Sequence, residues 1–169
     1  MENEKQKIIT IDESTNVLIL NIYTKDGKDT GEVLEFNLKD IELLDRLDKM
    51  HNENIKNQKW INDQLVIIDK KQDFERKGYL LSNNERLKYD ALKSFYKKQR
   101  EIFDMFLGKG GVDKLLYGRV FQWDTIVEIK KIINEQIEPY LDINMKDIES
   151  EIKQKYGTLN KGNVLKENE

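Results

Sequence analysis

The spacing of the apolar residues changes once, near residue 39, and this change constrains the fold more than any other feature. Before it, residues 17–23 read VLILNIY, and residues 31–38, GEVLEFNL, place apolar side chains at alternate positions, as in a β-strand with one buried face. After it, apolar residues recur every three or four positions, the spacing of an amphipathic helix. The sequence therefore predicts a mainly α protein of the α+β class, with an N-terminal β-hairpin followed by helices.

The two apolar runs before residue 39 form the predicted hairpin. Asp26 and Gly27 lie between them and are typical of a tight hairpin turn. The segment IITI at residues 8–11 suggests an additional edge strand. A two-stranded hairpin is only marginally stable alone, so we expect its apolar face to pack on the helices. The predicted organisation is one domain in three parts: the hairpin at 1–38, a helical part at 39–156 and a flexible tail at 157–169.

The helical part divides at residues that commonly start or stop helices. A long first helix is expected from residue 39 to about Phe74, and a break within the asparagine-rich residues 51–58 is left open because asparagine is a poor helix former. A bundle of three to four further helices follows. Their expected limits are Ser82 to Gly108, Val112 to Tyr117 closed by Gly118, Trp123 to a break or kink at Pro139, and Met145 to Tyr156 ended by Gly157.

Two of these helices carry clear apolar stripes that are expected to face the core. The stripe of the second long helix comprises Leu87, Leu92, Phe95, Ile102, Phe103 and Phe106, and that of the later helix comprises Trp123, Ile126, Ile129, Ile133 and Ile137.

A glycine run at residues 108–114, GKGGVDK, invites comparison with a phosphate-binding loop. Such loops follow a strand and end in a glycine, a lysine and a Ser or Thr that holds magnesium. Here Asp113 stands in place of the last glycine, Leu115 follows Lys114, and a helix precedes the run. We therefore interpret Gly108, Gly110, Gly111 and Gly118 as turn residues that let the chain reverse between helices.

The composition limits the possible functions. The 29 Lys and Arg and the 32 Asp and Glu are mixed along the chain and give a net charge of −3, which argues against a nucleic-acid partner, since such binding depends on clustered basic residues. With no cysteine and a single histidine, His51, neither a thiolate metal site nor a histidine-rich one is expected. No apolar stretch reaches the about 20 residues that span a bilayer, and a secretory signal is not evident. The sequence predicts a cytoplasmic, non-catalytic protein with no cofactor.

Two stretches resemble the tail assembly chaperones of long-tailed bacteriophages and prophages of Gram-positive bacteria. Residues 34–47, LEFNLKDIELLDRL, run from a strand into an acidic amphipathic helix, and residues 102–118, IFDMFLGKGGVDKLLYG, place an aromatic, acidic helix end before the glycine corner. In that family a further helix follows the glycine corner, as the sequence predicts for this chain. The resemblance extends over about residues 15–141 and rests on the order of these patterns.

The resemblance implies a protein that binds the long helical tape measure protein, keeps it soluble and recruits tail tube subunits around it. It implies residence in the host cytoplasm and absence from the finished virion. Amphipathic helices suit such a task, because they can cover the apolar stripe of a helical partner, and many weakly bound copies along one partner gain avidity. Homo-oligomerisation is compatible with long, thinly apolar helices.

Five residues are candidates for partner contacts. Leu115, Leu116 and Tyr117 form a short apolar turn that either packs under the glycine corner or faces a partner. Trp60 and Trp123 have the chemistry of interface residues, although their helical spacing also fits a core position. His51 is interpreted as a solvated helix residue, because no nucleophile accompanies it.

Two other functions remain open. The chain could be a permanent structural component of a phage tail or contractile particle, held through the edge of its hairpin by strand addition. It could also be a small DNA-binding regulator, for which binding to duplex DNA should depend on salt.

Overall fold

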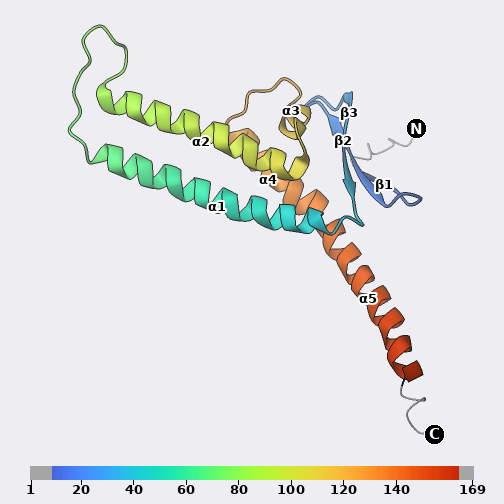
Figure 1. The fold of residues 1–169 in the computed structure, drawn as a ribbon. Helices are drawn as coiled ribbons and strands as arrows, with labels where there is room; N and C mark the ends of the chain where they lie inside the picture. Colours follow the sequence, from blue (N-terminus) through green and yellow to red (C-terminus); the bar gives the residue numbers. More distant parts are fainter. Residues whose placement is uncertain (1–8, 164–169) are drawn as a thin grey trace.

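The computed structural model describes residues 9–163, and within them the side chains of residues 143–145 and 155–163 are not described. The fold is α+β and mainly helical, as predicted (Figure 1). Its elements are β1 (Ile9–Asp12), β2 (Val17–Tyr23), β3 (Asp29–Asn37), α1 (Glu42–Asp69), α2 (Asn83–Leu107), α3 (Gly111–Leu116), α4 (Trp123–Ile132), the π-helix η1 (Ile133–Ile137) and α5 (Glu138–Asn163).

The N-terminal strands form an antiparallel sheet in the order β1-β2-β3. The predicted hairpin is therefore present, and the suggested edge strand is β1. Alternate side chains of β2 and β3 are buried and face each other across the ladder, with Leu18 opposite Phe36 and Leu20 opposite Leu34. This alternation gives the sheet one apolar face, and Phe36 on that face stacks on Phe106 of α2, with 5.4 Å between ring centroids.

Helices α1 and α2 lie side by side and antiparallel, and the loop that joins them lies at the end far from the sheet (Figure 1). Helix α1 is continuous, so the alternative of a break within residues 51–58 is wrong. The reason is tertiary: Asn54 and Asn57 are buried against α2. Asn57 donates from Nδ2 to the Gln99 side-chain oxygen (3.0 Å) and to the Phe95 carbonyl (3.3 Å), and Gln99 donates to Asn54. These bonds between helices outweigh the low helix propensity of asparagine.

The first helix ends at Asp69, earlier than the predicted end near Phe74. Asn84 at the start of α2 explains this end, because its Nδ2 donates to the carbonyls of Ile68 (3.2 Å) and Lys71 (2.9 Å). Carbonyls at the end of a helix have no amide donor further along the same helix. Here the side-chain amide of Asn84, from the neighbouring helix, donates hydrogen bonds at this end. The predicted start of α2 is confirmed: Ser82 and Glu85 form a reciprocal capping box.

The helical backbone runs through Pro139 and Gly157, so neither of the expected interruptions ends it. Just before the proline, the Glu138 amide donates to the Ile133 carbonyl, a π-helical hydrogen bond. A proline provides no amide for the preceding turn, and the wider π-turn accommodates it. Gly157 lies within α5, which continues to Asn163, since one glycine weakens a helix without necessarily ending it. The predicted flexible tail is thus helical as far as Asn163, and its remainder lies outside the described residues.

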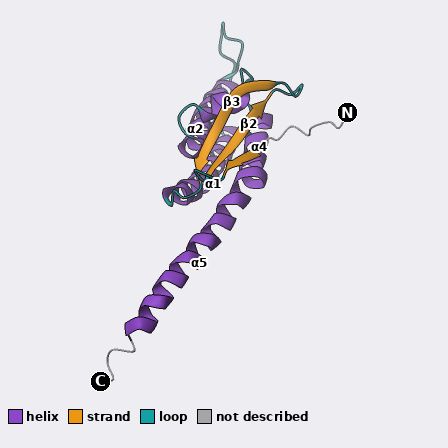
Figure 2. Cartoon of the chain, turned by 90° about the vertical axis from the view of Figure 1, so that its right-hand side faces the viewer, coloured by secondary structure: helices purple, strands orange, loops and turns teal. Residues whose placement is uncertain are grey.

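Helix α5 extends away from the rest of the molecule (Figure 2). The core lies between the apolar face of the sheet and the helices that meet there, and the two predicted stripes enter it with two clear exceptions. Leu92 and Trp123 are exposed. The other members of the stripe that begins at Trp123, which are Ile126, Ile129, Ile133 and Ile137, are buried as predicted.

Candidate partner-binding groove

The glycine corner joins α2 to α3. Gly108 ends α2 with φ 90° and ψ 161°, and Gly110 has the left-handed helical values φ 77° and ψ 8°. Gly108 is thus not in the left-handed helical region that is common just after a helix, but in an extended region with positive φ that is open almost only to glycine. Gly111 is the first residue of α3, and a Cβ there would lie 2.5 Å from the Leu107 Cβ. Gly118 also has a positive φ, 79°.

The polar groups of this corner contact other parts of the chain. The Val112 amide donates to Asp104 Oδ1 (2.9 Å), and Lys114 Nζ donates to the Val33 carbonyl of β3 (3.2 Å). Asp113 pairs with Arg100. The corner follows helix α2, and its amide, lysine and carboxylate hold α3 against α2 and β3. This arrangement agrees with the interpretation of the run as a turn between helices.

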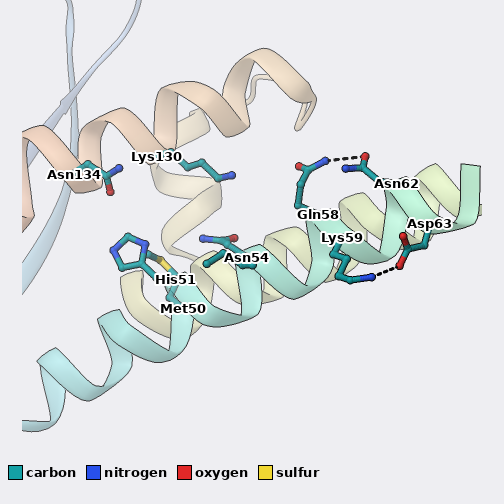
Figure 3. Close-up of a pocket in the computed structure, with 10 residues that line it drawn as sticks. Met50, His51, Asn54, Gln58, Lys59, Asn62, Asp63, Lys130 and Asn134 are labelled. Atoms are coloured by element: carbon teal, nitrogen blue, oxygen red, sulfur yellow. Dashed lines mark hydrogen bonds and ion pairs between the residues drawn. The ribbon is translucent and has the colours of Figure 1, made fainter. Parts of the chain in front are cut away.

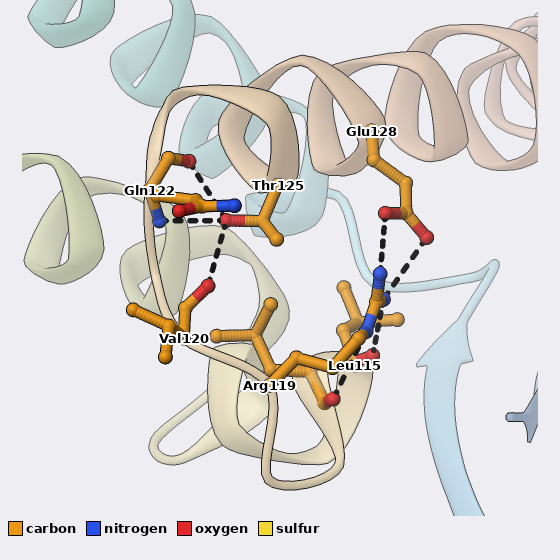
Figure 4. A network of polar contacts seen from close by, with 7 residues as sticks. Leu115, Arg119, Val120, Gln122, Thr125 and Glu128 are labelled. Atoms are coloured by element: carbon orange, nitrogen blue, oxygen red, sulfur yellow. Dashed lines mark hydrogen bonds and ion pairs between the residues drawn. The ribbon is translucent and has the colours of Figure 1, made fainter. Parts of the chain in front are cut away.

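A network around Arg119 then sets the position of α4 (Figure 4). The guanidinium forms two hydrogen bonds to the Glu128 carboxylate, at 2.6 and 3.0 Å, and donates to the carbonyls of Leu115 and Leu116 at the end of α3. The hydrogen bonds from Arg119 hold the pKa of Glu128 below its usual value, and those to Glu128 raise the pKa of Arg119. Thr125 adds a side-chain cap, since its Oγ1 accepts from the Gln122 amide at 2.9 Å.

The position of α4 explains why Trp123 does not face the core. Trp123 and Val127 are four residues apart and both are about half exposed, so they share a helix face. Lys130 and Asn134 continue that face at spacings of three and four. It is offset from the buried face of Ile126 and Ile129, and the predicted inward orientation of Trp123 is therefore wrong.

Between one side of α1 and the part of α4 and η1 that carries Lys130 and Asn134 lies a groove of about 600 Å³ (Figure 3). Residues of α1 line it in pairs four positions apart, as expected for one side of a helix over more than three turns. The distance from Met50 to Asp63 along the helix axis is about 20 Å at 1.5 Å per residue. The lining residues are Met50, His51, Asn54, Ile55, Gln58, Lys59, Asn62, Asp63, Lys130 and Asn134.

Lys130 is the chemically distinctive residue of the groove. It extends from α4 into the space beside α1 (Figure 3) and is partly buried. Among the described residues its side-chain amine has no hydrogen-bond or ion-pair partner. The uncharged polar side chains that line the groove with it include the amides of Asn54, Gln58 and Asn134. Burial lowers the pKa of Lys130, because removal from water disfavours the charged amine. An unpaired, partly buried cation is unfavourable unless an anion joins it.

The other charged groups of the groove are paired. Lys59 binds Asp63 at 2.6 Å on α1, and His51 Nε2 lies 3.7 Å from Glu138 at the start of α5. One exposed apolar residue, Ile55 of α1, lines the groove and is 68% exposed. Val66 lies on the same side of α1 as Ile55, three turns along and beyond the groove, and is also exposed. The groove thus combines an exposed apolar side chain with one unpaired positive charge.

Trp60 lines a different hollow, of about 340 Å³, between α1 and α2. The Glu53 carboxylate there binds Lys56 at 2.7 Å, and this hydrogen bond lowers the pKa of Glu53. Trp60 is exposed, so it is available for contacts with another molecule. It does not line the groove beside α4.

The five candidate contact residues are thus separated by the fold. Leu115 and Leu116 are buried in the core and are not available at the surface, whereas the adjoining Tyr117 is exposed. Trp60 and Trp123 are exposed on different surfaces. Sequence reasoning missed Lys130 and the groove amides. The regular spacing of Asn54, Gln58 and Asn62 was a visible signal, but the matching wall of α4 appears only in the folded chain.

Comparison with protein-family models, with curated proteins and with solved structures gave no match. Among the described residues, no helix is both long and apolar enough to cross a membrane. In that same part of the chain, no three His, Cys, Asp or Glu side chains cluster in a way that could hold a metal ion.

Proposed function

We propose that this protein is a non-catalytic tail assembly chaperone of a phage or prophage, which binds the helical tape measure protein in the cytoplasm and keeps it soluble. In this proposal it also helps to recruit tail tube subunits and leaves before the virion is complete. The observation that carries the proposal is the groove between α1 and α4, which follows more than three turns of α1 and is lined by the exposed apolar side chain of Ile55 together with amide and charged side chains.

A groove of this form suits a helical partner. Two helices form its walls, and an amphipathic helix buries its apolar stripe most readily between such walls. The exposed side chain of Ile55 beside the groove would give such a helix an apolar contact. The Lys59–Asp63 pair at the groove and the charged outer faces of α1 and α2 would keep the complex in solution.

Co-expression with the tape measure protein encoded by the same genome tests the proposal. We expect a larger soluble fraction of the tape measure protein and its recovery with the tagged chaperone. Unchanged solubility together with no co-purification would contradict the proposal.

A second candidate function is a permanent component of a tail or contractile particle, because β1 is an edge strand. Lys114 of α3 contacts the backbone of β3, whereas β1 pairs only with β2 among the described strands. A partner strand could extend the sheet there. Mass spectrometry of purified particles separates the two functions, because a component remains in the particle and a chaperone does not.

A further inference from the structure

We propose that the groove between α1 and α4 recognises an amphipathic helix of its partner through a glutamate or aspartate side chain that pairs with Lys130. This inference rests on the proposed function and adds the chemistry of the segment that is bound. It concerns a single contact in the groove, together with the apolar contact that the exposed Ile55 side chain offers.

The first argument is charge. Lys130 lies partly buried beside amide side chains, with no carboxylate partner among residues 9–163. Burial of a charge is unfavourable unless it is paired. A carboxylate from a partner would supply that pair, and the amides of Asn54, Gln58 and Asn134 could donate hydrogen bonds to its second oxygen.

The second argument is shape. The groove is lined along one side of α1 from Met50 to Asp63, a length that matches about 13 residues of a helix. Ile55 of α1 lines the groove and is exposed, and Val127, three residues before Lys130 on α4, is exposed on the adjoining surface. A partner helix with apolar residues at i, i+3, i+4 and i+7 could meet these side chains while its carboxylate reaches Lys130.

The same features disfavour nucleic acid as the occupant. A phosphate backbone needs several cations in a row, whereas the other lysine of the groove, Lys59, is already paired with Asp63. Asp63 at one end and Glu138 beside His51 at the other would repel phosphate groups.

Designed peptides test the pairing directly. The probes are three labelled amphipathic helices of about 20 residues, long enough to be helical, with identical leucine stripes and a central Glu, Gln or Lys. Fluorescence anisotropy measures their binding to the full chain. We expect the Glu peptide to bind about tenfold more tightly than the Gln peptide, and the Lys peptide to bind most weakly.

Variants of two adjacent lysines assign the effect to the groove. Lys130→Gln should remove the preference for the Glu peptide, and Lys130→Glu should reverse it, so that the Lys peptide binds most tightly. Lys131→Gln is the matched control, because Lys131 is exposed and lies 3.9 Å from Glu135 on the outside of the helix. It should keep the wild-type preference. Circular dichroism checks that each variant is folded, and the reversal by Lys130→Glu is a gain that misfolding would not produce.

The inference is overturned if the Glu and Gln peptides bind wild-type protein equally or not at all, or if both Lys130 variants keep the wild-type preference. These results are distinguishable from failure of the proposed function. If the peptide preference follows Lys130 but the tape measure protein stays insoluble, the function is wrong and the groove specificity stands. If solubility rises but the preference does not follow Lys130, only the groove specificity is wrong.

Discussion

At the scale of single residues, Gly111 is the position where close packing leaves no room for a side chain. A Cβ there would lie 2.5 Å from the Leu107 Cβ, and the latter is attached directly to the backbone and cannot turn away. We expect Gly111→Asn to lower the free energy of unfolding by about 1–3 kcal/mol, the usual cost of overpacking. Urea unfolding followed by circular dichroism measures the change.

Gly110→Asn is the matched control for this prediction. Gly110 has a left-handed helical backbone, and no atom lies within 4 Å of the place that a Cβ would take there. Asparagine tolerates that backbone better than most residues. We expect a loss below about 1 kcal/mol. Equal losses at the two positions would show that the close approach of Leu107 is not the limiting factor.

The ion pair between Arg119 and Glu128 predicts a dependence on pH. Hydrogen bonds from Arg119 lower the pKa of Glu128 in the folded protein. The stabilisation is therefore fully present above the ordinary pKa of glutamate, near 4.5, and is lost as the pH falls through the lower folded value. Because both side chains are partly exposed, we expect Glu128→Gln to cost less than about 1 kcal/mol at pH 7.

Comparing the unfolding free energies of wild type and Glu128→Gln at pH 7 and pH 3 checks this direction. The difference between the two proteins should shrink at pH 3. Glu135→Gln is the control, since the Glu135 carboxylate lies 3.9 Å from Lys131 and both side chains are well exposed. A difference for Glu128→Gln that grows on acidification would contradict the assigned role of the pair.

At the scale of elements, the α1–α2 pair depends on a buried amide cluster. Gln99 of α2 is 1% exposed and bonds to both Asn54 and Asn57 of α1. We expect Gln99→Leu to lower the free energy of unfolding by about 2 kcal/mol or more, because two buried amides lose a partner. Thermal or urea unfolding measures this change in the free energy of unfolding.

Replacement of the whole cluster provides the control. The triple variant Asn54→Leu, Asn57→Leu and Gln99→Leu leaves no unpaired amide among these three positions and should recover much of the lost stability, since apolar replacement of a complete polar cluster is often tolerated. If the triple variant is less stable than Gln99→Leu alone, the cost lies in packing and not in unpaired amides.

Local sequence signals predicted a strand or helix correctly where no other interaction in the folded chain changed its limits. The alternation of residues 17–38 predicted the strands, and Ser82 with Glu85 predicted the start of α2. The predictions of helix limits failed for two reasons. At the end of α1 a partner distant in sequence decides the outcome, because Asn84 donates to the carbonyls of Ile68 and Lys71. At Pro139 the cause is local, because a π-turn carries the helix past the proline, and the spacing of the apolar residues does not reveal it.

At the scale of the whole molecule, exposed apolar residues lie at separate places. Ile55 lines the groove between α1 and α4, and Val127 lies on the exposed face of α4 that precedes Lys130, whereas Phe74 and Leu80 lie in the loop at the far end of the α1–α2 pair. We expect Ile55→Ser with Val127→Ser to abolish the gain in soluble tape measure protein on co-expression. Exposed side chains contribute little to stability, so the unfolding free energy should change by less than about 1 kcal/mol.

Phe74→Ser with Leu80→Ser is the matched control, because it removes a comparable exposed apolar pair without touching the groove. It should leave the solubilising effect intact. Loss of the effect in this loop variant, with the groove variant still active, would place the partner at the tip of the helical pair and not in the groove.

The sequence by itself determined which segments become strands and helices and which of their faces are apolar, because periodicity and capping act over a few residues. It also indicated that the glycine run is a corner, through Asp113 and Leu115. Only the tertiary structure decided that Leu115 and Leu116 are buried, that Trp123 is exposed, and that Lys130 lies beside the amides of α1. The burial of Leu115 and Leu116 depends on the packing of α3 against α2 and β3, and the exposure of Trp123 depends on how α4 is held against α3. The place of Lys130 depends on how α1 and α4, which are about 70 residues apart in the chain, are set beside each other, and the spacing within either helix does not contain that information.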